Sequence, residues 1–156
     1  MTANLKAFLD MIAFSEIGVK LLSNSDNGYN VLVGGKLFSG YSDHPRVVVN
    51  LPKLGIKSSA AGRYQILARY YDHYKKQLKL ADFSPESQDF IAIQLIRECK
   101  ALNDIKSGRF DDAVHKCRSR WASLPGSNYG QHENKLSDLK LAYLSAGGSM
   151  AQTERG

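Results

Sequence analysis

Residues 5–18 read LKAFLDMIAFSEIG, and this stretch determines how the rest of the chain is interpreted. It predicts a short helix with one buried face, because apolar residues recur at helical spacing: Leu5, Phe8, Leu9, Ile12 and Ala13. Glu16 falls near the end of this helix, and Gly18 is the expected helix stop. The negative end of the helix dipole and the apolar neighbours should both raise the pKa of Glu16. A raised carboxyl pKa suits a general acid, although an ordinary solvated glutamate at a frayed helix end fits the same pattern.

The length and composition indicate one globular domain. The chain has 156 residues, of which 43% are hydrophobic and 23% are charged. We expect a single domain over residues 1–150, followed by a flexible tail at residues 151–156. No apolar run approaches the roughly 20 residues that a membrane span needs. Asp10 interrupts the apolar part of the N-terminus, which is therefore interpreted as mature structure and not as a signal peptide.

The charged residues, histidines and cysteines limit the kinds of partner. A net charge of +6 favours an anionic partner such as nucleic acid, an acidic membrane surface or an acidic polysaccharide. The basic residues are spread over separate helical segments among acidic ones, so no nucleic-acid groove is predicted. The four histidines lack metal-ligand spacing, and we expect neither a metal nor a cofactor. Cys99 and Cys117 are expected to be reduced, mostly buried thiols, and a disulfide between them stays open.

The order of the predicted elements indicates an α+β fold. After a polar loop at residues 19–28, two glycines at 34 and 35 separate apolar runs, as in a tight β-hairpin. Residues 41–57 are irregular, with a third strand or an extended lip near residues 47–49. The pattern is helical from about residue 59, turns at 103–108, and predicts further helices at 110–124 and 133–145. In the helix between these regions Ser84 is the expected N-cap, Pro85 the first helical residue, and Phe90 part of the buried side.

Two stretches combine aromatic and amide side chains that could meet an extended ligand. The first is KSSAAGRYQ at residues 57–65, expected at the start of a helix, where Tyr64 offers a stacking face and Gln65 an amide. The second is YGQ at residues 129–131, in an exposed loop. Aromatic faces beside amides suit sugar rings, whose C–H faces stack while their hydroxyl and acetamido groups form hydrogen bonds. Taken alone, each stretch also fits a purely structural helix start or loop.

Five stretches together carry a resemblance that covers nearly the whole chain. They are, in order, AFLDMIAFSE (7–16), GYNVLVGGKLFSGYSDHPR (28–46), KSSAAGRYQIL (57–67), YKKQLKLADFSPESQD (74–89) and RWASLPGSNYGQHE (120–133). In this order and spacing the chain resembles the phage lambda endolysin family of lytic transglycosylases, within the lysozyme-like superfamily. The resemblance implies a lysozyme-like α+β fold, with an N-terminal helix and a small antiparallel β-sheet packed beside a mostly helical lobe. It also implies an active-site cleft between these parts.

The resemblance further implies an activity and a set of site residues. The family cleaves the β-1,4 bond between N-acetylmuramic acid and N-acetylglucosamine in peptidoglycan, and closes a 1,6-anhydro ring on the muramic acid. Its catalytic glutamate ends the first helix and maps to Glu16. The two lips over the cleft (41–59 and 125–131) and the Gly-Arg-Tyr-Gln motif supply the predicted substrate-binding residues: Tyr41, His44, Ser58, Ser59, Tyr64, Gln65, Tyr129 and Gln131. Family members usually read Ser-Glu-Gly, whereas Ile17 intervenes here, so the loop after Glu16 is expected to run differently.

A second catalytic carboxylate would distinguish hydrolysis from transglycosylation. The other phage lysozyme family uses a Glu–Asp–Thr triad, whose last two positions hold Ser25 and Val31 here, with Asp26 one position away. A transglycosylase needs only Glu16, first as acid toward the leaving oxygen and then as base toward the attacking C6 hydroxyl. Two alternatives stay open: a hydrolytic muramidase with Asp26 or Asp43 as second carboxylate, and a non-catalytic domain that binds polysaccharide or nucleic acid.

The resemblance also implies where the protein acts and with what. Its partner would be the peptidoglycan glycan strand, not nucleic acid, and the protein would be a monomer. The positive net charge suits the acidic polymers of a bacterial envelope. We expect the protein to be stored in the host cytoplasm and to reach peptidoglycan in the periplasm after a holin has permeabilised the inner membrane.

Overall fold

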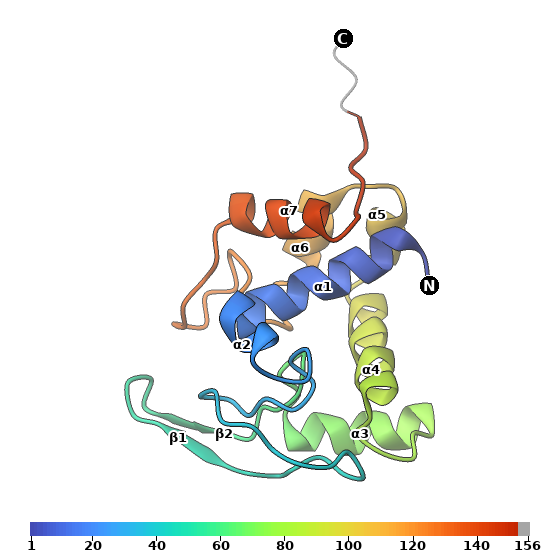
Figure 1. Ribbon diagram of the computed structural model, residues 1–156. Helices are drawn as coiled ribbons and strands as arrows, with labels where there is room; N and C mark the ends of the chain where they lie inside the picture. The colour runs from blue at the N-terminus through green and yellow to red at the C-terminus, as the bar shows by residue number, and fades with distance from the viewer. Residues whose placement is uncertain (153–156) are drawn as a thin grey trace. The chain divides into compact units, whose positions relative to one another are not determined.

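The computed structural model describes residues 1–152, in which helices predominate and one small sheet is present (Figure 1). The elements are α1 (Ala3–Ile17), α2 (Val19–Ser23), β1 (Val49–Leu51), β2 (Ile56–Ser58), α3 (Ala68–Leu78), α4 (Pro85–Glu98), α5 (Leu102–Lys106), α6 (Phe110–Cys117) and α7 (Leu136–Ser145). The chain divides into two compact units, the first made of Met1–Ser15 with the chain from Leu95 onward, and the second of Glu16–Gln94. The expected α+β class is confirmed. Residues 153–156 of the predicted tail lie outside the described residues.

Aromatic rings and one amide connect the helices of the first unit. Phe8 of α1 meets Phe110 of α6 edge to face, with 6.1 Å between the ring centroids. Phe110 in turn lies 4.6 Å, centroid to centroid, from Tyr143 of α7. The Asn4 side chain donates a 3.0 Å hydrogen bond to the carbonyl of Ile105 in α5. Helix α1 is therefore held by its apolar face, as its spacing predicted.

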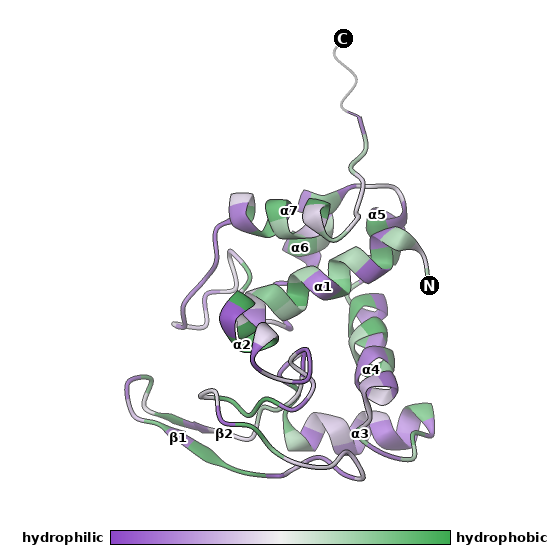
Figure 2. Cartoon of the chain, viewed as in Figure 1, coloured by the Kyte–Doolittle hydropathy of each residue, from purple (hydrophilic) through white to green (hydrophobic). Residues whose placement is uncertain are grey.

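The second unit contains the sheet, which is a hairpin. Strands β1 and β2 are antiparallel, with Val49 opposite Ser58 and Leu51 opposite Ile56. Helix α3 is mostly hydrophilic in Figure 2, and its buried residues are Tyr71 and Tyr74. A spacing of three places both rings on one face of the helix. The ring of Tyr71 packs against Phe83, with 5.1 Å between centroids.

Local signals located two helix ends correctly. Helix α1 ends at Ile17, and Gly18 adopts a left-handed φ of 86°, which glycine tolerates at a helix stop. Helix α4 begins at Pro85, and the Ser84 hydroxyl accepts a 3.3 Å hydrogen bond from the backbone N–H of Ser87. Ser84 is therefore the N-cap that the sequence predicted.

Other boundaries differ from the prediction. The loop expected at 19–28 contains α2, and the turn expected at 103–108 contains α5. Residues 31 and 37 form an isolated antiparallel bridge instead of the expected strands, while the strand expected near 47–49 begins at Val49. Helix α6 ends at Cys117 and not near 124, and α7 begins at Leu136 and not near 133. Phe90 is 58% exposed, because Ile91 and Ala92 occupy the buried face of α4.

The largest difference lies in the segment from 59 to 67, which was expected to be helical. Helix α3 begins only at Ala68. Before it, Ala61 bridges to both Leu32 and Ile66, and Gly62 and Gln65 adopt left-handed φ values of 84° and 51°. A left-handed residue interrupts a right-handed helix, so this motif is a chain of tight turns. No helix within residues 1–152 has the length and apolar character needed to cross a membrane.

Candidate functional site

Glu16 occupies the second-last position of α1 and is half-buried. The residue before it, Ser15, is held firmly: its hydroxyl lies 2.7 Å from that of Ser123. The side chain of Asn134 donates to both the carbonyl oxygen of Ser15 (2.9 Å) and its hydroxyl oxygen (3.0 Å). A carbonyl in the last turn of a helix has no partner within the helix, so Asn134 supplies one. These contacts fix the backbone on which Glu16 is mounted.

Asp26, the carboxylate considered as a second catalytic group, is bound by another predicted site residue. The Tyr41 hydroxyl donates a 2.6 Å hydrogen bond to Asp26 Oδ2. Burial and this bond raise the pKa of Tyr41, so the phenol stays protonated and keeps donating. Asp26 is also tethered through its backbone N–H, which donates to the Asn30 side chain at 2.8 Å. One carboxylate oxygen of Asp26 is therefore occupied in this structure.

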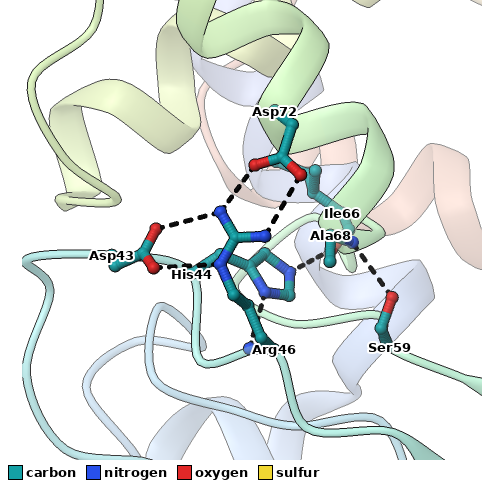
Figure 3. Close-up of polar contacts among 7 residues, drawn as sticks. All are labelled: Asp43, His44, Arg46, Ser59, Ile66, Ala68 and Asp72. Atoms are coloured by element: carbon teal, nitrogen blue, oxygen red, sulfur yellow. Dashed lines mark hydrogen bonds and ion pairs between the residues drawn. The ribbon is translucent and has the colours of Figure 1, made fainter.

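The sequence predicts a sugar contact for His44, but its ring is only 2% exposed. Its Nδ1 accepts a 2.9 Å hydrogen bond from the backbone N–H of Arg46, so this nitrogen carries no proton. Its Nε2 lies 2.8 Å from the carbonyl oxygen of Ile66 and must be the donor there. Burial lowers the pKa of His44, in agreement with a neutral imidazole. His44 connects the loop at 43–46 to the segment before α3 (Figure 3).

The guanidinium of Arg46 lies between two carboxylates (Figure 3). Its Nε donates to Asp43 at 2.9 Å, and its Nη1 donates to Asp72 of α3 at 3.1 Å. Both carboxylates have a lowered pKa, chiefly because of their hydrogen bonds to Arg46. The contacts of Asp43 therefore favour a structural role, in which it helps to attach the loop through Arg46, over a catalytic one. The Ser59 hydroxyl accepts a 3.0 Å bond from the backbone N–H of Ala68, the first residue of α3.

Tyr64, expected to present a stacking face, lies in the interior with 1% exposure. Its hydroxyl donates to Asp89 Oδ1 at 2.6 Å, and the hydroxyl of Tyr29 donates to the same oxygen at 2.9 Å. Arg63, itself 5% exposed, donates to the Tyr64 hydroxyl at 3.0 Å and to the Asn27 carbonyl at 3.0 Å. Burial and Asp89 raise the pKa of Tyr29 to about 12. The network fixes the Gly-Arg-Tyr-Gln motif.

A buried side-chain amide, that of Gln88, also holds the Gly-Arg-Tyr-Gln motif in place. The Gln88 side chain is fully buried, and its Oε1 accepts a 2.9 Å hydrogen bond from the Arg63 backbone N–H. Its Nε2 donates to the carbonyls of Tyr29 and Phe83 at 3.1 and 3.0 Å. A Cβ at Gly62 would collide with this amide, and Gly62 also has a φ of 84°. Position 62 therefore requires glycine.

Gln65 is half-buried and its amide is turned toward the backbone. Nε2 donates to the carbonyls of Gly62 (2.8 Å) and Val31 (3.3 Å). Ser58, at the end of β2, accepts a 3.1 Å hydrogen bond from the backbone N–H of Ala60. Both side chains therefore stabilise the turns between β2 and α3 in the second unit.

In the first unit, the loop at 125–131 presents Tyr129 and Gln131 to solvent. Tyr129 is 55% exposed, and its hydroxyl donates to the Ser119 carbonyl at 2.7 Å. Glu133 organises the loop, because its carboxylate accepts the backbone N–H groups of Gly126 (2.8 Å) and Asn128 (3.1 Å). These two bonds lower the pKa of Glu133. An exposed aromatic face on a tied loop is the arrangement that a sugar ring needs.

The structure groups the predicted residues by unit. Glu16 shares the second unit with the predicted residues from Tyr41 to Gln65, whereas Tyr129 and Gln131 belong to the first. The sequence analysis did not identify the residues that hold the predicted site residues and their loops in place. These are Ser15, Asp72, Gln88, Asp89, Ser123 and Asn134. Their partners are distant in the chain, so no local pattern could have identified them. No cluster of three or more potential metal ligands occurs within residues 1–152.

The fold is that of a lysozyme-like α+β protein. Lysozyme from bacteriophage lambda in complex with a chitohexasaccharide superposes with a TM-score of 0.91 at 48% identity, covering 96% of this chain and 97% of that one. A further structure titled lysozyme from bacteriophage lambda gives a TM-score of 0.85 at 47% identity, with the same coverage of 96% and 97%.

The sequence comparisons agree with the structural ones. The family model described as Endolysin matches residues 6–150, and the chain belongs to this family. It is 50% identical to the endolysin of Escherichia phage lambda over 151 residues, which are 96% of this chain and 94% of that protein. It is 48% identical to the endolysin of Escherichia phage P2 over 154 residues, covering 93% of each. The chain is thus a lysozyme-like enzyme of the peptidoglycan-cleaving glycosidase class.

Proposed function

We propose that this endolysin cleaves the β-1,4 bond between N-acetylmuramic acid and N-acetylglucosamine by lytic transglycosylation, with Glu16 as the sole catalytic carboxyl. The observation that carries the proposal is the hydrogen bond that occupies Asp26, the alternative second carboxylate that follows Glu16 in the sequence. Asp26 is bound by the Tyr41 hydroxyl at 2.6 Å, whereas a hydrolase would need a second carboxylate positioned to activate water or attack the sugar. One carboxyl suffices for a reaction in which the substrate carries its own nucleophile.

The mechanism uses Glu16 twice. Protonated Glu16 donates its proton to the glycosidic oxygen as the bond to C1 of the muramic acid breaks, leaving oxocarbenium-like charge on the ring. The resulting carboxylate then takes the proton of the C6 hydroxyl as that oxygen bonds to C1, closing the 1,6-anhydro ring. The C6 hydroxyl is tethered to the reacting ring, so its effective concentration is high and no water is consumed. The proton returned to Glu16 restores the starting enzyme.

The proposed substrate contacts are predicted residues whose side chains are exposed or half-buried. Tyr129 and Gln131 offer an exposed ring and amide for stacking and for hydrogen bonds to acetamido groups. Tyr41, Ser58 and Gln65 are half-buried and contribute polar groups from the second unit. The remaining predicted contacts, His44, Ser59 and Tyr64, are assigned to holding the loops that carry these residues. His44 and Tyr64 are buried, and the Ser59 hydroxyl accepts the backbone N–H of the first residue of α3.

The cellular setting is part of the same proposal. Residues 1–150 form one catalytic domain that acts as a monomer on the peptidoglycan glycan strand. The protein accumulates in the host cytoplasm and reaches the periplasm when a holin opens the inner membrane. The chitohexasaccharide bound by lambda lysozyme supports a glycan ligand, because both polymers present β-1,4-linked N-acetylated hexosamines. Neither nucleic acid nor a cofactor has a part in this scheme.

The test is mass spectrometry of the fragments released from purified sacculi. Transglycosylation yields fragments one water lighter than hydrolysis products, without a reducible muramic acid end. Reducible ends would reject the single-carboxyl mechanism and direct attention to Asp26. The variant Glu16→Gln should lose activity by about three orders of magnitude or more while keeping its fold, because the amide cannot donate the proton. If Glu16→Gln released normal fragments, the assignment of Glu16 would be wrong.

A further inference from the structure

The hairpin of β1 and β2 carries positive charge that no acidic side chain balances (Figure 1). No aspartate or glutamate occurs between Asp43 and Asp72, a stretch that contains the whole hairpin. Asp43 and Asp72 themselves are paired with Arg46. In the described part of the chain, Lys53 and Lys57 are exposed and form no ion pair. The hairpin therefore offers two positive charges to a ligand.

The register of the hairpin places one of these charges beside an amide. Lys57 of β2 lies directly opposite Asn50 of β1, and both residues are exposed. The side chains of directly opposite residues lie on the same face of a sheet, with about 5 Å between their Cβ atoms. Lys53 occupies the turn that joins the strands, where the backbone N–H of Gly55 donates to the Pro52 carbonyl at 3.2 Å. One short hairpin thus presents two ammonium groups and an amide.

The apolar side chains of the strands do not share the face of Asn50 and Lys57. Val49 and Leu51 are half-buried and lie on the opposite face, because side chains alternate along a strand. Ile56 is 40% exposed, but it pairs with Leu51 and so belongs to that opposite face. Binding to a lipid surface gains strength from buried apolar area as well as from charge. A polar, negatively charged ligand therefore suits the face of Asn50 and Lys57 better than a membrane does.

We propose that Asn50, Lys53 and Lys57 bind the stem peptide of peptidoglycan, which is the short peptide attached to the lactyl group of muramic acid. The inference rests on the proposed function, because it concerns the same substrate, and it adds a peptide contact to the glycan contacts. The stem peptide contains free carboxylates and backbone amides. The two ammonium groups complement the carboxylates, and the Asn50 amide donates to and accepts from the peptide backbone. The hairpin thereby selects glycan strands whose muramic acids carry an anionic peptide.

Each of these contacts is expected to be weak by itself. Exposed charge pairs contribute about 1 kcal/mol or less, which is roughly a threefold gain in affinity for each lysine and a tenfold gain for both. The gain should shrink as salt rises from about 0.1 M to about 1 M, because the screening length falls from about 10 Å to about 3 Å. Salt dependence is therefore part of the expected result.

The experiment is a chemical-shift titration of the unmodified protein with N-acetylglucosaminyl-N-acetylmuramyl tetrapeptide. This compound lacks the bond that the proposed reaction cleaves, so it binds without turnover. The matched ligand is the same compound with its carboxylates converted to amides. We expect the acidic form to bind roughly tenfold more tightly at low salt and to shift the backbone signals of the hairpin. Equal affinities for the two forms would overturn the proposal.

Variants identify the residues responsible for the preference. The double variant Lys53→Gln with Lys57→Gln should bind both forms equally, and Asn50→Asp should reduce the preference by placing a carboxylate opposite Lys57. Lys76→Gln is the matched control, because Lys76 is an exposed lysine of α3 in the same unit, and this variant should keep the preference. A preference that survives in the double variant would refute the assignment to the hairpin.

Two other results would assign the hairpin to a different partner and overturn the peptide assignment. The first is binding to phosphatidylglycerol vesicles that the double variant loses, together with equal affinities for the two peptide forms. The second is an equal loss of affinity for chitohexasaccharide and for both peptide forms in the double variant, which would indicate a glycan contact. A failure of the proposed reaction is detected separately, because reducible ends in the fragments released from sacculi leave all these affinities unchanged.

Discussion

The side-chain amide of Asn134 donates a 2.9 Å hydrogen bond to the carbonyl oxygen of Ser15, the residue immediately before Glu16. A second bond from the same nitrogen reaches the Ser15 hydroxyl at 3.0 Å, and the Asn134 backbone N–H donates to the Ser123 carbonyl at 2.8 Å. Asn134 therefore links the chain after the 125–131 loop to the end of α1. The backbone beside Glu16, the proposed catalytic carboxyl, is positioned by a residue far away in the sequence.

We expect Asn134→Ala to reduce both stability and activity. The change leaves the carbonyl of the buried Ser15 without its donor, which should cost about 1–2 kcal/mol in the free energy of unfolding. Because the end of α1 gains freedom, kcat should fall several-fold while Glu16 remains in place. Denaturant unfolding and turnover on purified sacculi measure the two effects. Asn103→Ala, at an exposed position of α5, is the control and should change neither; an unchanged kcat in Asn134→Ala would refute the positioning role.

The neutral, buried His44 predicts a specific loss of stability in mild acid. The unfolded chain takes up a proton on His44 near pH 6.5, whereas in the folded protein the pKa of His44 is lowered by burial. The unfolded state therefore binds more protons below this pH, and the free energy of unfolding should decrease as pH falls below about 6.5. The stability contribution is fully present above that pH.

Denaturant titrations between about pH 8 and pH 5 test this dependence. The variant His44→Gln should be less stable at high pH but should show a flatter decline below about 6.5. Exposed His73→Gln is the matched control and should keep the slope of the parent protein. Identical slopes for His44→Gln and the parent would show that a group other than His44 is responsible for the decline. Asp43, Asp72 and Asp82 do not explain a decline in this range, because their pKa values are lowered and they act at lower pH.

Arg46 should affect substrate binding more than folding. Its pairs with Asp43 and Asp72 are exposed, with 42% of the Arg46 side chain accessible, and exposed pairs contribute about 1 kcal/mol or less to stability. The forked contacts nevertheless tie the loop that precedes β1 to α3. We expect Arg46→Lys, which cannot bridge both carboxylates in the same plane, to raise KM roughly threefold with little change in kcat.

Steady-state kinetics on sacculi at two salt concentrations provide the measurement for Arg46. The control is Arg69→Lys, on the first turn of α3, where the guanidinium stacks on Tyr70 at 5.1 Å from the ring centroid. Arg46→Lys should differ from this control in KM and not in unfolding temperature. A large loss of stability in Arg46→Lys would indicate that the cluster maintains the fold itself.

Two tyrosines of the second unit should respond in opposite directions to loss of the hydroxyl. The hydroxyl of Tyr71 is buried and has no hydrogen-bond partner within the described residues, so Tyr71→Phe removes an unsatisfied polar group. We expect the free energy of unfolding to stay equal or to rise by up to about 1 kcal/mol. Tyr64→Phe instead removes the donor to Asp89 and should cost about 1–3 kcal/mol. Chemical denaturation of both variants tests the contrast, and comparable losses would contradict it.

The sequence predicted those features that depend on neighbours in the chain. Ser84 and Pro85 mark the start of α4 because an N-cap and its helix lie within one turn, and Gly18 ends α1 for the same reason. The apolar spacing of α1 likewise placed Phe8 and Ile12 on its buried face. Glu16 could be placed near the end of α1 because the apolar spacing and Gly18 indicate where that helix ends.

Other features depend on distant residues and could not be predicted. The helix expected from residue 59 is replaced by turns because Ala61 bridges to Leu32. Tyr64 looks like an exposed ligand platform until Asp89, 25 positions away, accepts its hydroxyl. Asn134 and Ser15 are separated by 119 positions, and nothing near either residue indicates the contact. In each case a tertiary partner outweighed the local pattern.

Gly62 gives the Gly-Arg-Tyr-Gln string, a short sequence motif, a structural role in addition to the substrate-binding role that the family resemblance implies. Any larger residue at position 62 would displace the Gln88 amide, and with it the bonds to Arg63, Tyr29 and Phe83. An uncharacterised protein carrying this string can therefore be expected to share the turn that it folds into, whatever chemistry its own surface performs. For protein engineers, the string marks a part of the scaffold to leave intact while the exposed loop around Tyr129 is varied.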